Sequence, residues 1–199
     1  MIDFRKTTFI KTVVEVTQRP SFLLPEVIFI GRSNVGKSSL INALTQIKGL
    51  AKVSTKPGKT RYLNYFNVDD TFYLVDAPGF GYTQRGKQEL EQFAGIMDTY
   101  FQTAQPTLAL YLIDGRRVLT EEDSRFITHL NQSMNIVIVF TKVDKLNQSA
   151  KAHLRNHIRQ LGLQDDQCAL VSIHEAKAMQ RFRNQLDAMI SLKKQVAAL

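Results

Sequence analysis

The segment from Gly31 to Ser38 combines glycines, a lysine and a hydroxyl at fixed spacing. Its residues, which fit the phosphate-loop pattern G-x-x-x-x-G-K-[ST], are Gly31, Arg32, Ser33, Asn34, Val35, Gly36, Lys37 and Ser38. Glycines let the backbone curl around phosphate oxygens, and the N-terminus of a following helix adds positive potential. We expect Lys37 to reach the β- and γ-phosphates of a nucleotide and Ser38 to bind Mg²⁺.

Asp76-Ala77-Pro78-Gly79 follows a predicted strand farther along the chain. Asp76 can hold Mg²⁺ through a water molecule, and the Gly79 N–H can bond to a γ-phosphate. Taken alone, this segment is better explained as a Pro-Gly turn after a strand. Downstream of a phosphate loop, it indicates the second half of a magnesium and phosphate site.

Thr141-Lys142-Val143-Asp144 has the pattern that reads guanine. The Asp144 carboxylate can accept hydrogen bonds from guanine N1–H and the 2-amino group, whereas adenine offers neither donor there. The stem of Lys142 would lie along the base. The motif commonly begins with Asn, so a lysine-rich loop is the alternative explanation. After the last strand, Val171-Ser172-Ile173 would cover the base, with a backbone N–H near O6.

A candidate first switch lies between the phosphate loop and Asp76. Thr60 would complete the Mg²⁺ shell and sense the γ-phosphate, since Pro57 and Gly58 bend the chain just before it. The alternative is that Thr60 merely starts a strand. The nucleotide-binding residues expected in this segment are Gly58, Lys59, Thr60, Arg61 and Tyr62.

Phe80 stands directly after Gly79, where many GTP-hydrolysing proteins carry Gln. That Gln orients the attacking water, and a phenyl ring cannot do so. Intrinsic hydrolysis should therefore be slow, with another group assisting. The residues expected to act in catalysis are Lys37, Thr60, Gly79 and Asn34.

The motifs sit in an alternation of apolar strand-length runs and helical patterns. This alternation predicts an α/β fold, a mostly parallel sheet with helices on both faces, in which ligands bind at the carboxyl ends of the strands. The predicted hairpin of Arg61–Val68 and Thr71–Val75, with an Asp69-Asp70 turn, adds an antiparallel edge. The other expected strands are 27–30, 107–113, 136–140 and 169–171. The expected helices start at Ser38 and cover 89–101, 120–131 and 149–161, with a last helix marked by Met179 to Ile190. Residues 1–20 are expected to form an arm or edge element, and residues 21–199 a single GTPase domain.

The net charge of +8 is concentrated in the first third of the chain. Residues 1–61 carry 11 Lys and Arg against 3 Asp and Glu, whereas the rest carries 15 of each. Within 48–61 there are five basic residues and no acid. A solvated loop and a nucleic-acid contact explain this segment about equally well.

Composition limits the classes of protein that remain. A single cysteine, Cys168, excludes an internal disulfide and a cysteine-based zinc cluster, and it fits a reducing cytoplasm. No apolar run is long enough for a signal peptide or a membrane span. We expect a cytoplasmic monomer.

With these motifs in order, the sequence resembles the EngB (YihA/YsxC) family of bacterial ribosome-assembly GTPases, a branch of the P-loop GTPases. In that family Thr at the Thr141 position is usual. The resemblance runs from about Phe22 to the C-terminal helix, with Ala77 and the segment after Ser172 departing from the common pattern. It implies GTP and GDP binding with Mg²⁺, a role in maturing the large ribosomal subunit through its RNA or proteins, and a link to division septum formation.

A related group of GTPases with a hydrophobic residue at the Phe80 position coordinates K⁺ through an asparagine. By that resemblance, Asn34 would hold K⁺ near the β/γ bridge; the alternative is that its side chain only bonds to the loop backbone. Two other functions remain possible from the sequence. A signalling GTPase is disfavoured by the absent Gln and lipid motif. A P-loop nucleotide kinase would need lid arginines, for which Arg116-Arg117 is the candidate pair.

Overall fold

The computed structural model describes residues 1–21, 24–53, 62–80, 87–104, 106–117, 119–131, 134–164 and 166–197. The strands are β1 (Thr7–Val13), β2 (Glu26–Gly31), β3 (Leu63–Val68), β4 (Phe72–Asp76), β5 (Leu108–Asp114), β6 (Ile136–Thr141) and β7 (Cys168–Leu170). The α-helices are α1 (Lys37–Thr45), α2 (Lys87–Ala104), α3 (Glu121–Asn131), α4 (Gln148–Gln160) and α5 (Ala176–Ala197). Two 3-10 helices cover Val16–Gln18 (η1) and Val143–Lys145 (η2).

All seven described strands form one mixed sheet, in the order β1-β3-β4-β2-β5-β6-β7. The five strands from β4 to β7 in this order are parallel, and β3 and β1 add antiparallel pairs at one end. The predicted α/β fold is therefore confirmed, with one more antiparallel strand than the hairpin alone would give. The hairpin turn uses left-handed backbone at Asp69 (φ 49°) and Asp70 (φ 47°), as tight strand connections require.

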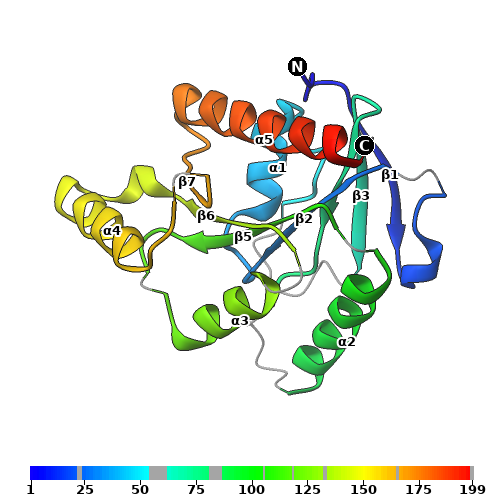
Figure 1. Cartoon of the computed structure of the whole chain (residues 1–199), viewed down its shortest axis with the longest axis horizontal. Coiled ribbons are helices and arrows are strands. Elements are labelled where there is room, and N and C mark those ends of the chain that lie inside the picture. Colours follow the sequence, from blue (N-terminus) through cyan, green and yellow to red (C-terminus); the bar gives the residue numbers. More distant parts are fainter. Residues whose placement is uncertain are drawn as a thin grey trace.

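Successive side chains of each strand point to opposite faces of the sheet, so each face of the sheet has its own hydrophobic core. On β2, Val27 and Phe29 belong to the cluster that contains the buried side chains of α1 and α5. Ile28 and Ile30 point to the other cluster, which includes residues of α2, α3 and α4. Helices α1 and α5 thus cover one face of the sheet, while α2 and α3 lie across the other (Figure 1). Continuous apolar runs in the central strands follow from this double burial.

The motifs meet at the carboxyl ends of neighbouring strands. The phosphate loop follows β2, whose neighbours in the sheet are β4 on one side and β5 on the other. The strands that follow β2 in the chain thus lie on both sides of it, and ligands of open α/β sheets bind at such a position. Asp76 ends β4 and Thr141 ends β6. Ser172 comes two residues after β7.

The N-terminal segment joins the same sheet as its edge strand. β1 pairs with β3, and the Ile2 N–H donates to the Asp187 carboxylate of α5 at 3.1 Å. Phe9 and Ile10 on β1 are exposed. In the described part of the chain, no helix has the length and apolar character needed to cross a membrane.

Candidate nucleotide-binding site

The loop between β2 and α1 has the backbone that the phosphate-loop pattern predicts. Asn34 (φ 61°) and Gly36 (φ 108°) are left-handed, which curls the chain before α1 begins at Lys37. Gly31 permits a close approach, since an added Cβ would lie 2.8 Å from the Leu112 carbonyl oxygen. Val35 is buried, whereas the side chain of Asn34 is exposed and has no hydrogen bond to any described residue.

Lys37 and Asp76 form a buried pair of opposite charges beneath this loop. The Lys37 ammonium donates to the Gly31 carbonyl at 3.1 Å, and burial lowers its pKa although nearby Asp76 opposes this. Burial raises the pKa of Asp76 to about 6 against the effects of Lys37 and of a hydrogen bond from Ser38. Asp76 Oδ1 is buried without a hydrogen-bond partner among the described residues. A buried carboxylate oxygen beside the Ser38 hydroxyl fits a hard cation such as Mg²⁺.

Gly79 lies directly against the phosphate loop. A Cβ at this position would be 2.9 Å from Ser33 Oγ and 3.0 Å from Lys37 Nζ, so no side chain fits without displacing these groups. Ala77 is fully buried, and its N–H donates to the Phe29 carbonyl at 3.1 Å. Pro78 is buried as well. The close approach places the Gly79 backbone where it can contact a group bound by Lys37.

Phe80 pairs with the phosphate loop through its backbone and with the sheet through its ring. Its carbonyl accepts from the Ser33 N–H at 2.9 Å, in a parallel bridge between Arg32 and Phe80. The ring stacks on Tyr111 at a centroid distance of 6.3 Å and lies 6.0 Å from Phe126 of α3. The side chain at the position commonly held by Gln is thus part of an aromatic cluster and carries no group that could orient water.

Thr141 ties the loop after β6 to the phosphate loop. Its buried hydroxyl donates to the Val35 carbonyl at 2.7 Å and lies 3.3 Å from the Ile113 carbonyl. A threonine in this place therefore joins the loop after β6 to the phosphate loop. Although Thr141 replaces the commoner Asn, the loop after β6 and the phosphate loop are still joined.

Lys142 adds a second connection between the same loops. Its ammonium donates to the Asn34 carbonyl at 2.8 Å and to Asp114 Oδ2 at 2.9 Å. Its stem passes over Gly36, since a Cβ built there would be 3.9 Å from the Lys142 Cε. Asp114 was not identified from the sequence. Its position as the last residue of a strand beside the phosphate-loop strand is the signal that could have found it.

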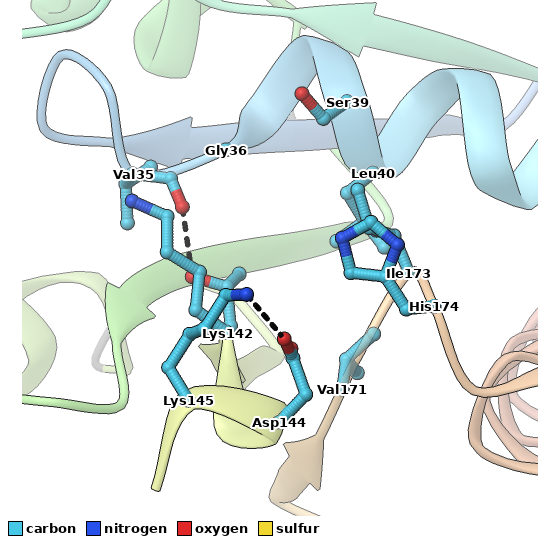
Figure 2. A pocket seen from close by; sticks show the side chains of 11 residues that line it. Val35, Gly36, Ser39, Leu40, Lys142, Asp144, Lys145, Val171, Ile173 and His174 are labelled. Atoms are coloured by element: carbon cyan, nitrogen blue, oxygen red, sulfur yellow. Dashed lines mark hydrogen bonds and ion pairs between the residues drawn. The ribbon is translucent and has the colours of Figure 1, made fainter.

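Asp144 lines a cavity of about 240 Å³ between α1 and the loops after β6 and β7 (Figure 2). Partial burial alone would raise its pKa, but a hydrogen bond from Ser172 and the nearby Lys145, 3.5 Å away, hold the pKa below the ordinary value. Asp144 is thus kept as an anion, ready to accept hydrogen bonds. Val143 packs in the core beneath it.

The loop after β7 closes the far side of this cavity. Val171, Ile173 and His174 line it opposite Ser39 and Leu40 of α1. Ser172 is fully buried, and its hydroxyl accepts from the His174 N–H at 3.2 Å. Val171 and Ile173, which were expected to cover the base, thus line the cavity, and Ser172 makes a hydrogen bond within the same loop.

The first switch lies largely outside the described residues. Those outside are Gly58, Lys59, Thr60 and Arg61, whereas Tyr62 is described and is exposed just before β3. The start of the basic segment is held in place by Asn42 of α1. The Asn42 side chain accepts from the Ala51 N–H at 2.7 Å and donates to the Ala51 carbonyl at 2.9 Å.

The arginine pair that a kinase lid would need is engaged elsewhere. Arg116 binds Asp114 at 2.7 Å, and Arg117 binds the buried Asp123 at 2.8 Å. Each guanidinium makes two hydrogen bonds to its carboxylate. Both arginines are thus paired with carboxylates of the chain.

Comparisons with known proteins agree with this geometry. Residues 26–142 match the family model described as 50S ribosome-binding GTPase. The chain is 41% identical over 166 residues to the probable GTP-binding protein EngB of Chlorobium phaeobacteroides (strain BS1), covering 81% of this chain and 85% of that protein. It is 45% identical over 150 residues to the EngB protein of Porphyromonas gingivalis (strain ATCC 33277), covering 74% and 75%. A crystal structure of a probable GTP-binding protein engB superposes with a TM-score of 0.63 at 21% identity, covering 83% of this chain and 98% of that one. The match to this family model and the identity to these relatives show that the chain belongs to the EngB family of GTP-binding proteins, among the 50S ribosome-binding GTPases.

Proposed function

We propose that this protein hydrolyses GTP slowly to GDP and phosphate and uses the two nucleotide states as a switch during assembly of the large ribosomal subunit, in the cytoplasm. The observation that supports this most is the joining of the two nucleotide loops. Thr141 and Lys142 bond to the carbonyls of Val35 and Asn34, so one rigid contact positions a guanine pocket beside a phosphate cradle. The family supports the choice of a ribosomal partner.

The buried pair explains how the triphosphate would be held. Lys37 is already desolvated, so its ammonium interacts strongly with an anion that replaces the Gly31 carbonyl as its partner. Ser38, Thr60 and Asp76 would bind Mg²⁺, which neutralises charge on the β- and γ-phosphates. The Gly79 N–H would bond to the γ-phosphate, so the chain after β4 would respond to whether that phosphate is present.

A slow rate follows from the position of the Phe80 ring. The ring is packed on Tyr111 and Phe126, and hydrolysis would depend on charge stabilisation at the phosphate loop. Asn34 is exposed at that loop and carries a free amide oxygen among the described groups, which suits a monovalent cation such as K⁺.

The proposed switch acts through the basic segment 48–61. Asn42 fixes Ala51, and Thr60 would be drawn to Mg²⁺ in the GTP state, so both ends of the segment would be held only with GTP bound. Five positive charges would then be fixed in one arrangement, which suits a polyanion such as ribosomal RNA.

The test is binding to large ribosomal subunits across a salt series, using the Lys52→Gln, Lys56→Gln and Lys59→Gln triple variant. We expect the slope of log affinity against log salt to fall by up to roughly three units in the GTP-analogue state, because three phosphate contacts are removed. Because Lys59 could also contact the nucleotide, the GTP affinity of the triple variant is measured as well. A triple variant that keeps the wild-type slope while binding GTP normally would contradict the role of this segment.

A further inference from the structure

A second basic surface lies on the opposite edge of the sheet from β1. Among the described strands β7 pairs with β6, and its other edge borders a groove of about 590 Å³ between α4 and α5, where Gln185 donates to the Cys168 carbonyl at 3.3 Å. In Figure 1 this strand lies between the two helices. Lys151, Arg155 and Arg159 line the α4 side of the groove, and Arg181 lines the α5 side.

These four cations are not neutralised within the described part of the chain. No side-chain hydrogen bond or ion pair joins any of them to another described residue, whereas Arg116 and Arg117 are both paired. Helix α4 contains no acidic residue, and Glu175 is the acid among the groove-lining residues. The groove therefore has a net positive charge available to a partner.

The floor of the groove indicates what kind of partner it suits. Phe182 (2% exposed), Ile158 (7%) and Leu154 (8%) are already covered there, while Leu146, Leu163 and Leu170 are half-buried. Four cations line the two sides of the groove against one acid, Glu175. This excess of positive charge favours a polyanion.

The spacing on α4 is regular. Lys151, Arg155 and Arg159 follow each other at intervals of four residues, so they lie on one face with a rise of about 6 Å per step. That rise is comparable to the separation of successive phosphates along a nucleic-acid strand. Two of the three are arginines, whose planar guanidinium matches phosphate oxygens in pairs.

The groove also adjoins the guanine pocket. Val171 lines both cavities, and Val143, next to Asp144, lines the groove. A partner in the groove would touch the two loops that hold the base.

We propose that the groove between α4 and α5 binds the sugar–phosphate backbone of RNA, with Lys151, Arg155, Arg159 and Arg181 contacting phosphates. This surface is separate from segment 48–61. Its contacts need no γ-phosphate, so they should exist in the GDP state as well.

The experiment compares two variants that each lose three charges. The groove variant is Lys151→Gln, Arg155→Gln and Arg159→Gln. The control variant is Lys6→Gln, Lys11→Gln and Arg125→Gln. It removes the same charge from the residue before β1, from β1 itself and from α3. Both are titrated in the GDP state with RNA extracted from large ribosomal subunits. In salt between about 50 and 200 mM, the groove variant should lose at least tenfold in affinity at the low end and two to three units of slope, while the control changes by less than one unit.

Two further measurements keep the outcome decisive. GDP affinity should match that of the wild type in both variants, which shows that they are folded. Arg181→Gln alone, on the opposite side of the groove, should lower the slope of log affinity against log salt by about one unit. This single variant serves as the test if the triple variant does not fold.

Equal losses in the groove and control variants would overturn the proposal, because net charge alone would then explain them. It is also overturned if the groove variant binds RNA normally but loses binding to a polyglutamate peptide, which would indicate an acidic protein segment. If the groove variant loses RNA while the nucleotide dependence of subunit binding persists, the groove and the switch are independent.

Discussion

Thr141 shows how one hydroxyl replaces a larger amide at a shared position. It is 6% exposed, and its hydrogen bond of 2.7 Å to Val35 joins residues 106 positions apart in the chain. This bond fixes the end of β6, and Asp144 follows three residues later in a short 3-10 helix, Val143–Lys145. Sequence alone identified the motif but could not establish that a threonine reaches the phosphate loop.

Asp144→Asn should weaken GTP binding sharply and shift preference toward a xanthine nucleotide. The new amide places a donor where guanine also donates, and losing paired buried bonds costs about 2–4 kcal/mol. Titration calorimetry with GTP, ATP and a xanthine nucleotide measures this. Asp98→Asn, on the exposed side of α2, serves as a control. GTP affinity within a factor of two of the wild type would show that Asp144 does not read the base.

GTP turnover should be faster in KCl than in NaCl at equal ionic strength. A cation near the β/γ bridge would supply charge stabilisation that the Phe80 side chain cannot. The Asn34→Ala variant should lose the difference between the salts. Because Asn34 is left-handed at φ 61°, Asn34→Gly is the matched variant that removes the side chain without backbone strain. Identical wild-type rates in both salts would eliminate K⁺ as the assisting group.

At the scale of the elements, α3 is fixed to β5 by a buried carboxylate. Asp123 accepts from the Tyr111 hydroxyl at 2.7 Å and from Arg117 at 2.8 and 2.9 Å. Thr120 and Asp123 form reciprocal hydrogen bonds at the start of the helix, as in a capping box. The same Tyr111 ring stacks on Phe80, so this network supports the segment beside the phosphate loop.

Asp123→Asn should destabilise the fold and remove part of its acid sensitivity. Burial alone would raise the pKa of Asp123, but the bonds from Arg117 and Thr120 outweigh it and keep the pKa below the ordinary value. A lowered pKa in the folded state means that the stabilisation is present at neutral pH and declines as pH falls below about 5. We expect a loss of about 3 kcal/mol at pH 7 in urea unfolding, shrinking toward pH 4. A loss that is constant between these pH values would show that the charge of Asp123 is not what stabilises α3.

The elements that the sequence predicted well are those with continuous apolar runs. β5 and β6 were expected within a residue of their observed bounds, because strands buried on both faces leave an unbroken apolar signature. β1 carries no such signature, since only Thr7 and Val13 at its ends are buried. Its pairing with β3 depends on backbone hydrogen bonds and on contacts across the strands, such as Phe9 with Phe66, which no pattern within β1 itself reveals.

Charged residues were harder to interpret, because their roles depend on packing between elements. In the sequence, Arg183 is one of several cations of the last helix and nothing distinguishes it from the others. In the structure its guanidinium donates to the Leu44 and Ala43 carbonyls at 2.8 and 2.6 Å, capping α1. The cations of α4 form the larger surface, and only the fold brings them opposite Arg181.

At the scale of the whole molecule, the sheet carries its nucleotide pocket at the strand ends and a basic groove at the β7 edge. The motifs predicted from sequence meet at the pocket because parallel strands end at one side of a sheet. The groove was not predicted, since its sides come from separate helices. The central claim is that the guanine pocket controls contact with the large ribosomal subunit.

The most direct test is sedimentation with large ribosomal subunits, using wild-type protein and the Asp144→Asn variant with non-hydrolysable guanine and xanthine triphosphate analogues and with GDP. Wild-type protein should bind subunits more tightly with the GTP analogue than with GDP, since segment 48–61 adds its contacts only in the GTP state. The variant should bind with the xanthine analogue but no longer with the GTP analogue, because base recognition and partner binding are then coupled through one site. Equal binding of wild-type protein in the GTP-analogue and GDP states would contradict the account.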